Sequence, residues 1–515
     1  MEPFVYSLPS TLNLRKLRQH LPPEPGYSVC LQGGEMQQAV LLDTFDNSMF
    51  QAAKLIIKVD RQLLLFDLQT GQLFEQAAPV GPLVINDMER GPVVDILLTL
   101  ARLRALLPVA EVRVRKEEGR ILDDQEKTLV RLCHLTISCG RKMAGLGCVR
   151  YLRGYSRAYE NLRQGLENCG ATACGNAEDV YARLGIVRRE YSIKPEIGLF
   201  PETPVKESAT TILRTFLKIA RQNEQGIIAD SDSEFLHDYR VCLRKIRSVL
   251  SLLGGVFDAE ESTRLKVELA EIMRTTNGLR DLDVYLLKRA EYYRLVPPSA
   301  HEGLQILFDE FAQRRKAKKK KVGTILQSKQ YLRRMKNLEQ LFAAGSNIKS
   351  GPQADSPSLL FGRRLIIKRY RKVCKTGRVV DETTPDSSIH QLRIHCKKLR
   401  YLMEFFTSLF PPAEIKQLIR ALKLLQTNLG KFNDYSVQQQ FLEKLLQSGI
   451  VGGAKALTVA SSVGALTSML YQLQGDEQGR IIEHLAAFDS PDIRDAFRKL
   501  FKAEGGAHED NSLLQ

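Results

Sequence analysis

The strongest constraint in this sequence is an internal repeat of two short motifs at one fixed separation. A basic segment that starts at His237 has the order H-x-x-R-x-x-x-R-K-x-R, and one that starts at His390 has the order H-x-x-R-x-x-x-K-K-x-R. Asp281 and Asp434 lie in a second pair of matching segments. Both pairs are 153 residues apart, from 237 to 390 and from 281 to 434. Two matches at one separation predict a duplicated structural unit with pseudo-twofold symmetry between its copies.

The spacing within each basic segment predicts a ridge of cations along one side of a helix. At ~100° per residue, positions i, i+3 and i+7 fall within roughly 60° of one another. Like charges this close repel, so an anion or nearby carboxylates must neutralise them; a solvated basic face paired with local acids is the alternative interpretation. The candidate residues of the two ridges are His237, Arg240, Arg244, Lys245 and Arg247, and His390, Arg393, Lys397, Lys398 and Arg400.

The side chains of these ridges suit phosphate. Guanidinium groups form bidentate hydrogen bonds to phosphate oxygens, and lysine ammonium groups act as point charges. Two such ridges related by pseudo-symmetry can line a cleft for an extended phosphate chain. Binding of that kind weakens with added salt.

The net charge follows the same division of the chain. Of the 75 basic and 59 acidic residues, the first 200 positions hold 25 and 23, which leaves 50 and 36 for the remainder. The excess is therefore +2 in the first part and +14 in the second. A positive field steers anionic ligands, so a polyanion is expected to bind the C-terminal part.

The chain has the pattern of two folded domains. Short apolar runs between 30 and 75, and runs at 110–122 and 127–137, predict strands, while 95–107 and 153–166 have helical periodicity. From 207 onward nearly every segment has helical spacing, and a Gly-, Ser- and Pro-rich break at 343–358 divides this part in two. We predict an α+β domain at 1–190, a linker at 191–204, an all-α domain at 205–502 with repeats at 205–342 and 359–502, and a flexible tail at 503–515.

The two basic segments, the Arg280-Asp281 element and LQTNLGKFND at 425–434 resemble the CHAD domain, the conserved histidine α-helical domain. The resemblance covers about 205–500 and includes both repeats. It implies a duplicated helical bundle that binds inorganic polyphosphate, often at polyphosphate granules, through the ridge residues named above. It also implies a phosphate contact from Arg280, although the second repeat has Asn433 at the matching position.

Other charged residues have structural or functional interpretations. Asp281 and Asp434 are predicted to be structural partners of the basic helices, because carboxylates that face polyphosphate would repel it. His390 and His395 are about 140° apart around a helix, so they should not bind one metal ion together, and a hydrogen bond to phosphate or a packed core position suits His237 and His390 better. The basic run at 314–321 is either a solvated helix face or a continuation of the polyanion surface.

The N-terminal part resembles the CYTH domain, the triphosphate tunnel fold, in LLDTFDNSMFQAAKLIIKVDRQ at 41–62 and LRGYSRAYENL at 152–162. This resemblance implies a tunnel-like β-barrel with helices over roughly 1–185. Active members begin with an E-x-E-x-K strand whose carboxylates bind a divalent metal, whereas residues 5–20 here have no acidic side chain. Glu111, Glu117 and Glu118 could rebuild such a site among neighbouring cations, although alternating charges on a strand are usually solvated pairs.

The sequence therefore predicts a polyphosphate-binding protein with a degenerate tunnel-fold domain, without a catalytic site, metal or cofactor. One alternative is a metal-dependent tri- or polyphosphatase. The other is a nucleic-acid binder, which the absence of tryptophan and of aromatic residues between the ridge cations disfavours. Nine cysteines without paired spacing, and an N-terminus without a signal-peptide pattern, predict a cytoplasmic location. The apolar stretch at 456–471 is predicted to be a closely packed helix and not a membrane span.

Overall fold

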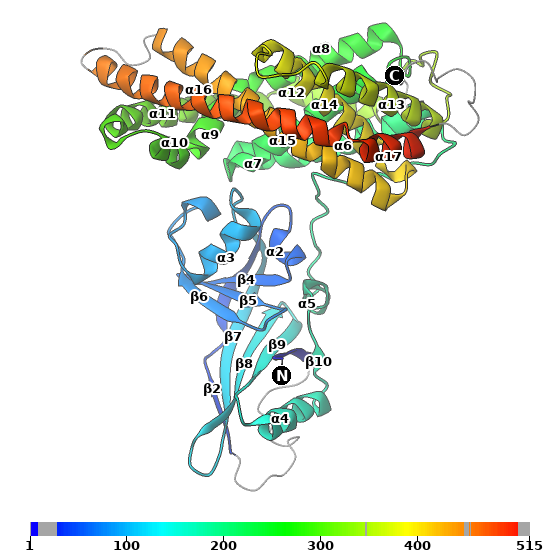
Figure 1. Cartoon of the computed structure of the whole chain (residues 1–515). Coiled ribbons are helices and arrows are strands. Elements are labelled where there is room, and N and C mark those ends of the chain that lie inside the picture. Colours follow the sequence, from blue (N-terminus) through cyan, green and yellow to red (C-terminus); the bar gives the residue numbers. More distant parts are fainter. Residues whose placement is uncertain (1, 9–27, 346–347, 448–452, 454, 503–515) are drawn as a thin grey trace. The chain divides into compact units, whose positions relative to one another are not determined.

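The computed structural model describes residues 2–8, 28–345, 348–447, 453 and 455–502, and the predicted tail at 503–515 lies outside them. The chain divides into two compact units. The first comprises Met1–Ile193 with Ser231–Glu234, and the second comprises Lys194–Asp230 with Phe235–Gln515. The first unit is built on an antiparallel sheet and the second is helical, in agreement with the predicted fold classes (Figure 1).

Ten strands form the sheet of the first unit, and all their pairings are antiparallel. The longest strand, β7, pairs along one edge with β3 and then β2, and along its other edge with β8. The strands are β1 (Phe4–Leu8), β2 (Ser28–Gly33), β3 (Gln37–Asp43), β4 (Lys54–Val59), β5 (Gln62–Asp67), β6 (Leu73–Ala77), β7 (Leu107–Leu122), β8 (Thr128–Cys139), β9 (Lys142–Tyr151) and β10 (Thr172–Ala173).

The sheet of the described residues is open, whereas a tunnel-like barrel was expected. Its order is β10-β1-β9-β8-β7-β3-β4-β5-β6, with β2 attached to β7, so β10 and β6 form its two ends. Apolar clusters join its faces to helices, because alternate strand residues point to opposite sides. These helices are α3 (Pro92–Ala101), α4 (Ser156–Asn168) and α5 (Ala177–Leu184), with a short α2 (Ser48–Gln51) before β4.

The helix predicted at 95–107 is shorter than its periodicity indicated. It ends at Ala101, after which Ala105 forms a bridge with Val84 and Leu106 donates a hydrogen bond to the carbonyl of Leu83. The leucines at the end of the apolar run therefore lead into β7, because their backbone groups pair with an extended segment instead of a helical turn.

The second unit contains only helices and connecting segments among the residues described. Three of its described helices follow a proline that supplies a fixed φ at the N-cap: Pro204 before α6, Pro357 before α13 and Pro385 before α14. The helices are α6 (Val205–Ala229), α7 (Ser233–Leu252), α8 (Ala259–Thr275), α9 (Asn277–Leu287), α10 (Arg289–Leu295), α11 (His301–Leu326), α12 (Lys329–Leu341), α13 (Ser358–Gly377), α14 (Asp386–Phe405), α15 (Pro412–Gln447), α16 (Lys455–Phe488) and α17 (Pro491–Phe501).

The separation of 153 residues recurs in the positions of the helices. The starts of α6, α7 and α8 at 205, 233 and 259 match the starts of α13, α14 and α15 at 358, 386 and 412. The match is interrupted after this point, because α15 runs unbroken through the region where the first repeat separates α8 from α9. It resumes at α11 and α16, which start at 301 and 455, or 455 − 301 = 154 residues apart. The duplication is therefore present in the helices as well as in the motifs.

Equivalent backbone groups of the two repeats are hydrogen-bonded to each other where the repeats begin. The Val205 amide donates to the carbonyl of Ser356 at 2.9 Å, and the equivalent Ser358 amide donates to the carbonyl of the equivalent Thr203 at 3.0 Å. Lys206 to Ala354 and Leu359 to Pro201 form a second exchanged pair, each 3.1 Å long. The segments that lead into α6 and α13, here called the entrances of the repeats, are thus joined by equivalent hydrogen bonds in both directions.

Helix α16 contains the apolar stretch predicted to pack closely. At Gly303 of α11 an added Cβ would collide with the Ser462 hydroxyl and the Thr458 carbonyl oxygen of α16, so these two helices approach closely. Among the residues described, α16 is the one helix long and apolar enough to cross a membrane by length and composition, with a mean hydropathy of 1.2 in its most apolar window. A core helix meets the same criterion.

Candidate functional site

Each repeat brings its two motif elements together at the motif histidine. In the first repeat, Nη2 of Arg280 on α9 lies 2.8 Å from Nδ1 of His237 on α7. In the second, Oδ1 of Asn433 on α15 lies 2.6 Å from Nδ1 of His390 on α14. The contacts are equivalent, since 237 and 390, and 280 and 433, are all separated by 153. A metal ion is disfavoured at His237, because the Arg280 guanidinium already lies against the ring.

Arg240 is fixed at the corner between α8 and α9. Its Nη1 donates to the carbonyl of Met273 at 3.0 Å, to Oγ1 of Thr276 at 2.7 Å and to Oδ1 of Asn277 at 2.8 Å. Burial and the Arg244 charge lower the pKa of Arg240, and the Asp281 carboxylate opposes this shift. Arg240 therefore holds the ridge to the corner as well as contributing its charge.

The two ridges meet at Arg244 and Lys397, which occupy equivalent positions in the repeats. Burial, followed by the charges of Arg244, Arg393 and Arg400, lowers the pKa of Lys397 to about 7, while Asp434 acts in the opposite direction. Arg244 of α7 thus acts directly on the ridge of α14. Its buried Nε has no hydrogen-bond partner among the described residues. An anion placed among these cations would relieve their repulsion.

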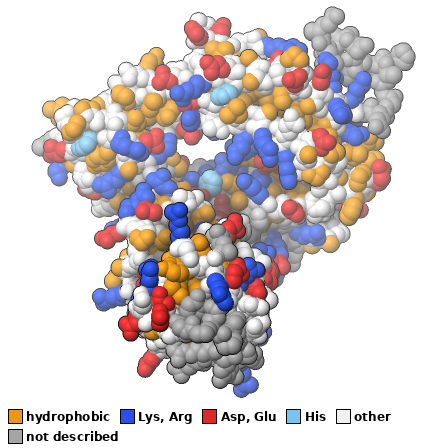
Figure 2. Space-filling view, turned by 60° about the horizontal axis from the view of Figure 1, so that its bottom comes forward, with side chains coloured by type: hydrophobic (Ala, Val, Ile, Leu, Met, Phe, Trp, Pro, Cys, Tyr) orange, Lys and Arg blue, Asp and Glu red, His pale blue; other side chains and the backbone are white. Residues whose placement is uncertain are grey.

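In Figure 2 many Lys and Arg side chains lie on the visible face of the helical unit. Arg244, Arg393 and Lys397 are all half-buried. Charges at a partly enclosed surface are screened less by solvent than charges on an open helix face, so their field on a bound anion is stronger.

Glu404 of α14 neutralises part of the basic surface. It lies 3.4 Å from Nζ of Lys245 and 3.4 Å from Nε of Arg400. Lys245 is buried and also lies 4.5 Å from the centre of the Phe216 ring. Its ammonium group therefore links the two repeats through Glu404, and Lys245 is the ridge cation least available to a ligand.

The remaining ridge cations differ in their surroundings. Nη1 of Arg247 lies 3.8 Å from the sulfur of Met273, which is a weak acceptor. Lys398 belongs to a second basic group around His395, whose pKa is lowered by burial and by the charges of Arg369, Lys372 and Lys398. The basic surface of the second repeat therefore includes residues outside the motif, namely Arg369 and Lys372.

The basic group around His395 was missed by the sequence analysis. Arg369 and Lys372 lie on α13, and Nη1 of Arg369 is 3.5 Å from Nδ1 of His395. The signal was available, because seven Lys or Arg residues lie between 363 and 375. It was overlooked because matching the repeats selects only shared features, and the first repeat has Phe216 at the position equivalent to Arg369.

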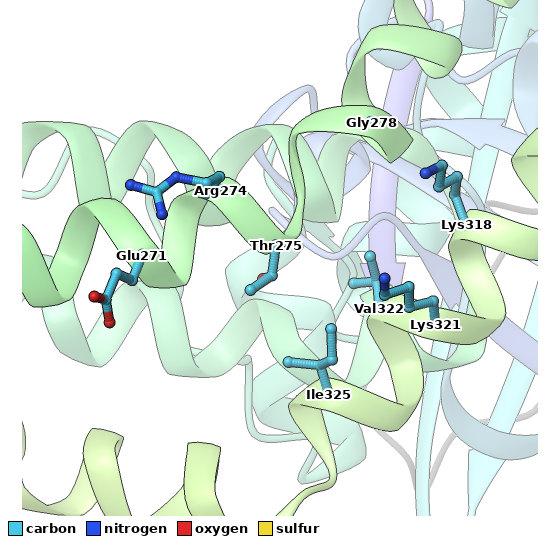
Figure 3. A pocket seen from close by; sticks show the side chains of 8 residues that line it. All are labelled: Glu271, Arg274, Thr275, Gly278, Lys318, Lys321, Val322 and Ile325. Atoms are coloured by element: carbon cyan, nitrogen blue, oxygen red, sulfur yellow. The ribbon is translucent and has the colours of Figure 1, made fainter.

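In the basic run of α11, some cations are ion-paired with described residues and others are not. Arg315 is held by Asp230 at 2.7 Å and by the buried Asp283 at 2.6 Å, so it is a structural residue. Arg314 pairs with Glu310 at 2.5 Å. Lys318 and Lys321 face a pocket beside the α8–α9 corner instead (Figure 3).

Carboxylates in the sheet of the first unit are paired with neighbouring cations. Glu117 lies 3.3 Å from Arg115, and Glu118 lies 3.0 Å from Lys116. Glu117 faces the buried His134 across the strand pair, and burial lowers the pKa of that histidine to about 3. Both carboxylates are thus ion-paired, but only the pair of Glu118 is solvated as expected, because Glu117 is buried. Residues 9–20 of the segment compared with the E-x-E-x-K strand lie outside the described residues.

A comparison with protein families identifies a CHAD domain within the helical unit. The family model of the CHAD domain matches residues 211–443. Two curated relatives, the uncharacterized proteins MT2285 and Rv2226 from two strains of Mycobacterium tuberculosis, are each 26% identical over 292 residues, which is 55% of this chain and 52% of the relative. The match thus spans about half the length of these relatives.

Two solved structures are similar to part of the chain. The crystal structure of the CHAD domain from the plant Ricinus communis is 24% identical, with a TM-score of 0.48 over 57% of this chain and 96% of that one. PptA from Streptomyces chartreusis is 14% identical, with a TM-score of 0.39 over 58% of this chain and 99% of that one.

Proposed function

This chain is a CHAD-domain protein, and we propose that its helical unit binds inorganic polyphosphate at the surface where α7 and α14 meet. The observation that carries the proposal is the group of Arg244, Arg393 and Lys397, three half-buried cations from equivalent helices that Asp434 only partly offsets. An anion with repeated charges matches such a surface better than a single phosphate does.

We propose a mechanism of multivalent electrostatic capture. Phosphate oxygens accept hydrogen bonds from the guanidinium groups and lie beside the ammonium group of Lys397. Condensed counter-ions are released from the polyanion, so affinity falls linearly on a logarithmic scale as salt is added. Arg240, Arg247, Lys398, Arg400 and the two motif histidines flank this centre, whereas Lys245 is left to its pairing with Glu404.

A pseudo-twofold relation between the repeats belongs to this proposal. The exchanged hydrogen bonds at Val205 and Ser358, and the equivalent histidine contacts, support it. Polyphosphate repeats the same group along its length, so it can present equivalent oxygens to both ridges at once. A symmetric surface therefore suits this polymer, and attachment to polyphosphate granules in the cytoplasm would follow from it.

We assign no catalysis to the first unit in this proposal and regard it as a degenerate relative of the CYTH domain. The pairing of Glu117 with Arg115 and of Glu118 with Lys116 supports this interpretation. A divalent cation needs several oxygen ligands that are not already neutralised.

The deciding experiment measures binding of labelled long-chain polyphosphate to the full chain across a salt series. We expect Arg244→Gln/Lys397→Gln to weaken binding on the order of 100-fold, because two charge-assisted contacts are lost. The variant should remain folded, since it removes repulsion. Lys416→Gln/Lys423→Gln on α15 removes the same charge from exposed positions and should have little effect.

Three outcomes contradict the proposal. The first is no binding by the wild-type chain, and the second is an equal loss in both variants. The third is equal competition by RNA, which would favour the nucleic-acid alternative. Release of phosphate from tripolyphosphate with magnesium or manganese would instead restore the phosphatase alternative.

A further inference from the structure

A basic pocket lies outside the two ridges, between the α8–α9 corner and α11. It has a volume of about 360 Å³, and its apolar wall is formed by Val322 and Ile325. Figure 3 shows Arg274 on α8, and Lys318 and Lys321 on α11, around this space. Lys318 and Lys321 are three residues apart, so they lie on one side of their helix. The pocket therefore combines three cations from two helices.

The cations of this pocket have no carboxylate partner within ion-pair distance among the described residues. Arg274, Lys318 and Lys321 make no ion pair and no side-chain hydrogen bond with the described residues. Glu271 also lines the pocket, but it lies 2.8 Å from Arg334 and is engaged there. Arg315, on the same helix, differs by having two carboxylate partners. An excess of positive charge thus remains at the pocket.

The pocket adjoins the ridge of the first repeat. Arg240 is bonded to Met273, Thr276 and Asn277, while Arg274, Thr275 and Gly278 line the pocket. The partners of Arg240 and the residues that line the pocket are interspersed along the α8–α9 corner. The three residues from Arg274 to Asn277 can extend over at most ~10 Å. A flexible anion at Arg240 therefore needs to pass only this corner to reach the pocket.

The second repeat has no equivalent pocket charge. Its positions matching Arg274, Lys318 and Lys321 are Thr427, Tyr471 and Gln474. Gly278 is replaced by Lys431, whose ammonium group lies 3.3 Å from Glu477. The additional cations are thus a property of the first repeat alone.

We propose that this pocket is a further polyphosphate subsite, which continues the path of a long chain from the paired ridges past the α8–α9 corner. The inference depends on the proposed function. It adds the direction in which a polyphosphate chain extends from the ridges and a preference for long polyphosphate chains. A chain too short to span the ridges and the corner binds at the ridges only. A long chain gains the pocket contacts and extends on the side of the first repeat.

The test compares long-chain polyphosphate with tripolyphosphate as probes, each bound to the full chain across a salt series. We expect Lys318→Ala/Lys321→Ala to weaken binding of the long chain about tenfold and to reduce its salt slope by about 2, since two phosphate contacts are lost. Tripolyphosphate binding should stay within about twofold of wild type, because only the pocket is altered.

The matched control is Lys316→Ala/Lys320→Ala. It removes two exposed lysines from the same helix, outside the pocket lining. An equal loss of long-chain binding in the control would overturn the inference, because only net charge would then matter. An equal loss for tripolyphosphate in the pocket variant would also overturn it, because the pocket would then be an independent phosphate site.

Failure of the proposed function would look different. In that case the wild-type chain binds neither probe, or Arg244→Gln/Lys397→Gln leaves both affinities unchanged. If the ridge variant weakens both probes and the pocket variant weakens neither, the proposed function stands and the inference fails.

Discussion

The two repeats of the helical unit have the same opening helices but distribute their charges differently. The first buries an ion-paired group, in which Arg315 joins Asp230 and Asp283, where the second has Ser468, Thr383 and Ser436. The second brings cations together around Lys397 and His395, while Arg274, Lys318 and Lys321, which make no ion pair with the described residues, belong to the first. The repeats therefore share the positions of their opening helices and the motif histidines, whereas the first adds an ion-paired group and a basic pocket and the second adds a basic group around His395.

The largest effect is expected from removing the ion-paired group of the first repeat. Arg315→Met should lower the free energy of unfolding by about 3–5 kcal/mol, because it leaves Asp283, whose side chain is 2% exposed, without its cation. Chemical denaturation followed by circular dichroism measures this change. Ser468→Ala, at the equivalent exposed position, should stay within about 0.5 kcal/mol. Similar losses in both variants would remove the contrast between the repeats.

The pH dependence of polyphosphate binding tests the contribution of Lys397, a cation of the second repeat. Lys397 faces Arg244 of α7, Arg393 and Arg400 of α14 and Asp434 of α15, and its Nζ lies 5.9 Å from the Tyr401 ring centre. Its pKa of about 7 means that the free protein loses this proton as pH rises above 7, whereas bound phosphate favours the charged form. Affinity should therefore fall above pH 7, by at most about tenfold per pH unit.

The control for this prediction is Lys397→Arg, since arginine stays protonated throughout the range. Its binding should be nearly independent of pH between 7 and 9. An unchanged profile in this variant would show that another group takes up the proton. The depressed pKa also means that the folded state binds fewer protons than the unfolded state between pH 7 and about 10, so this lysine destabilises the fold less as pH rises.

The smallest effect is expected from restoring the arginine that the second repeat lacks. Asn433→Arg places a guanidinium beside His390, as Arg280 does beside His237, and should strengthen polyphosphate binding about threefold while raising the salt slope by about 1. The gain is limited because His390 is exposed and charges there are screened. Asn433→Gln, which adds length without charge, should leave affinity unchanged, and an equal gain in that variant would exclude a charge effect.

The sequence was sufficient to predict those features that both repeats share. Matching motifs led to the duplicated helices and to the ridges, because helical spacing fixes which side chains share a face. It could not predict which cations are neutralised, since the partners of Lys245 and Arg315 lie far away in the sequence. It also extended one helix past Ala101, because the following leucines suit a helix face and a strand equally. The open sheet depends on pairings between distant strands, which local periodicity does not encode.

The exchanged hydrogen bonds at the entrances of the repeats have a consequence for the origin of the chain. Each entrance supplies the donor and acceptor that the other requires, from the same positions of the repeat. Two separate copies of one such repeat would satisfy each other in the same way, which is the self-complementary interface of a symmetric homodimer. The arrangement is the one expected if a single-repeat ancestor assembled in pairs before gene duplication and fusion joined the two copies. In a fused chain each copy can carry substitutions of its own, whereas a homodimer carries every substitution twice.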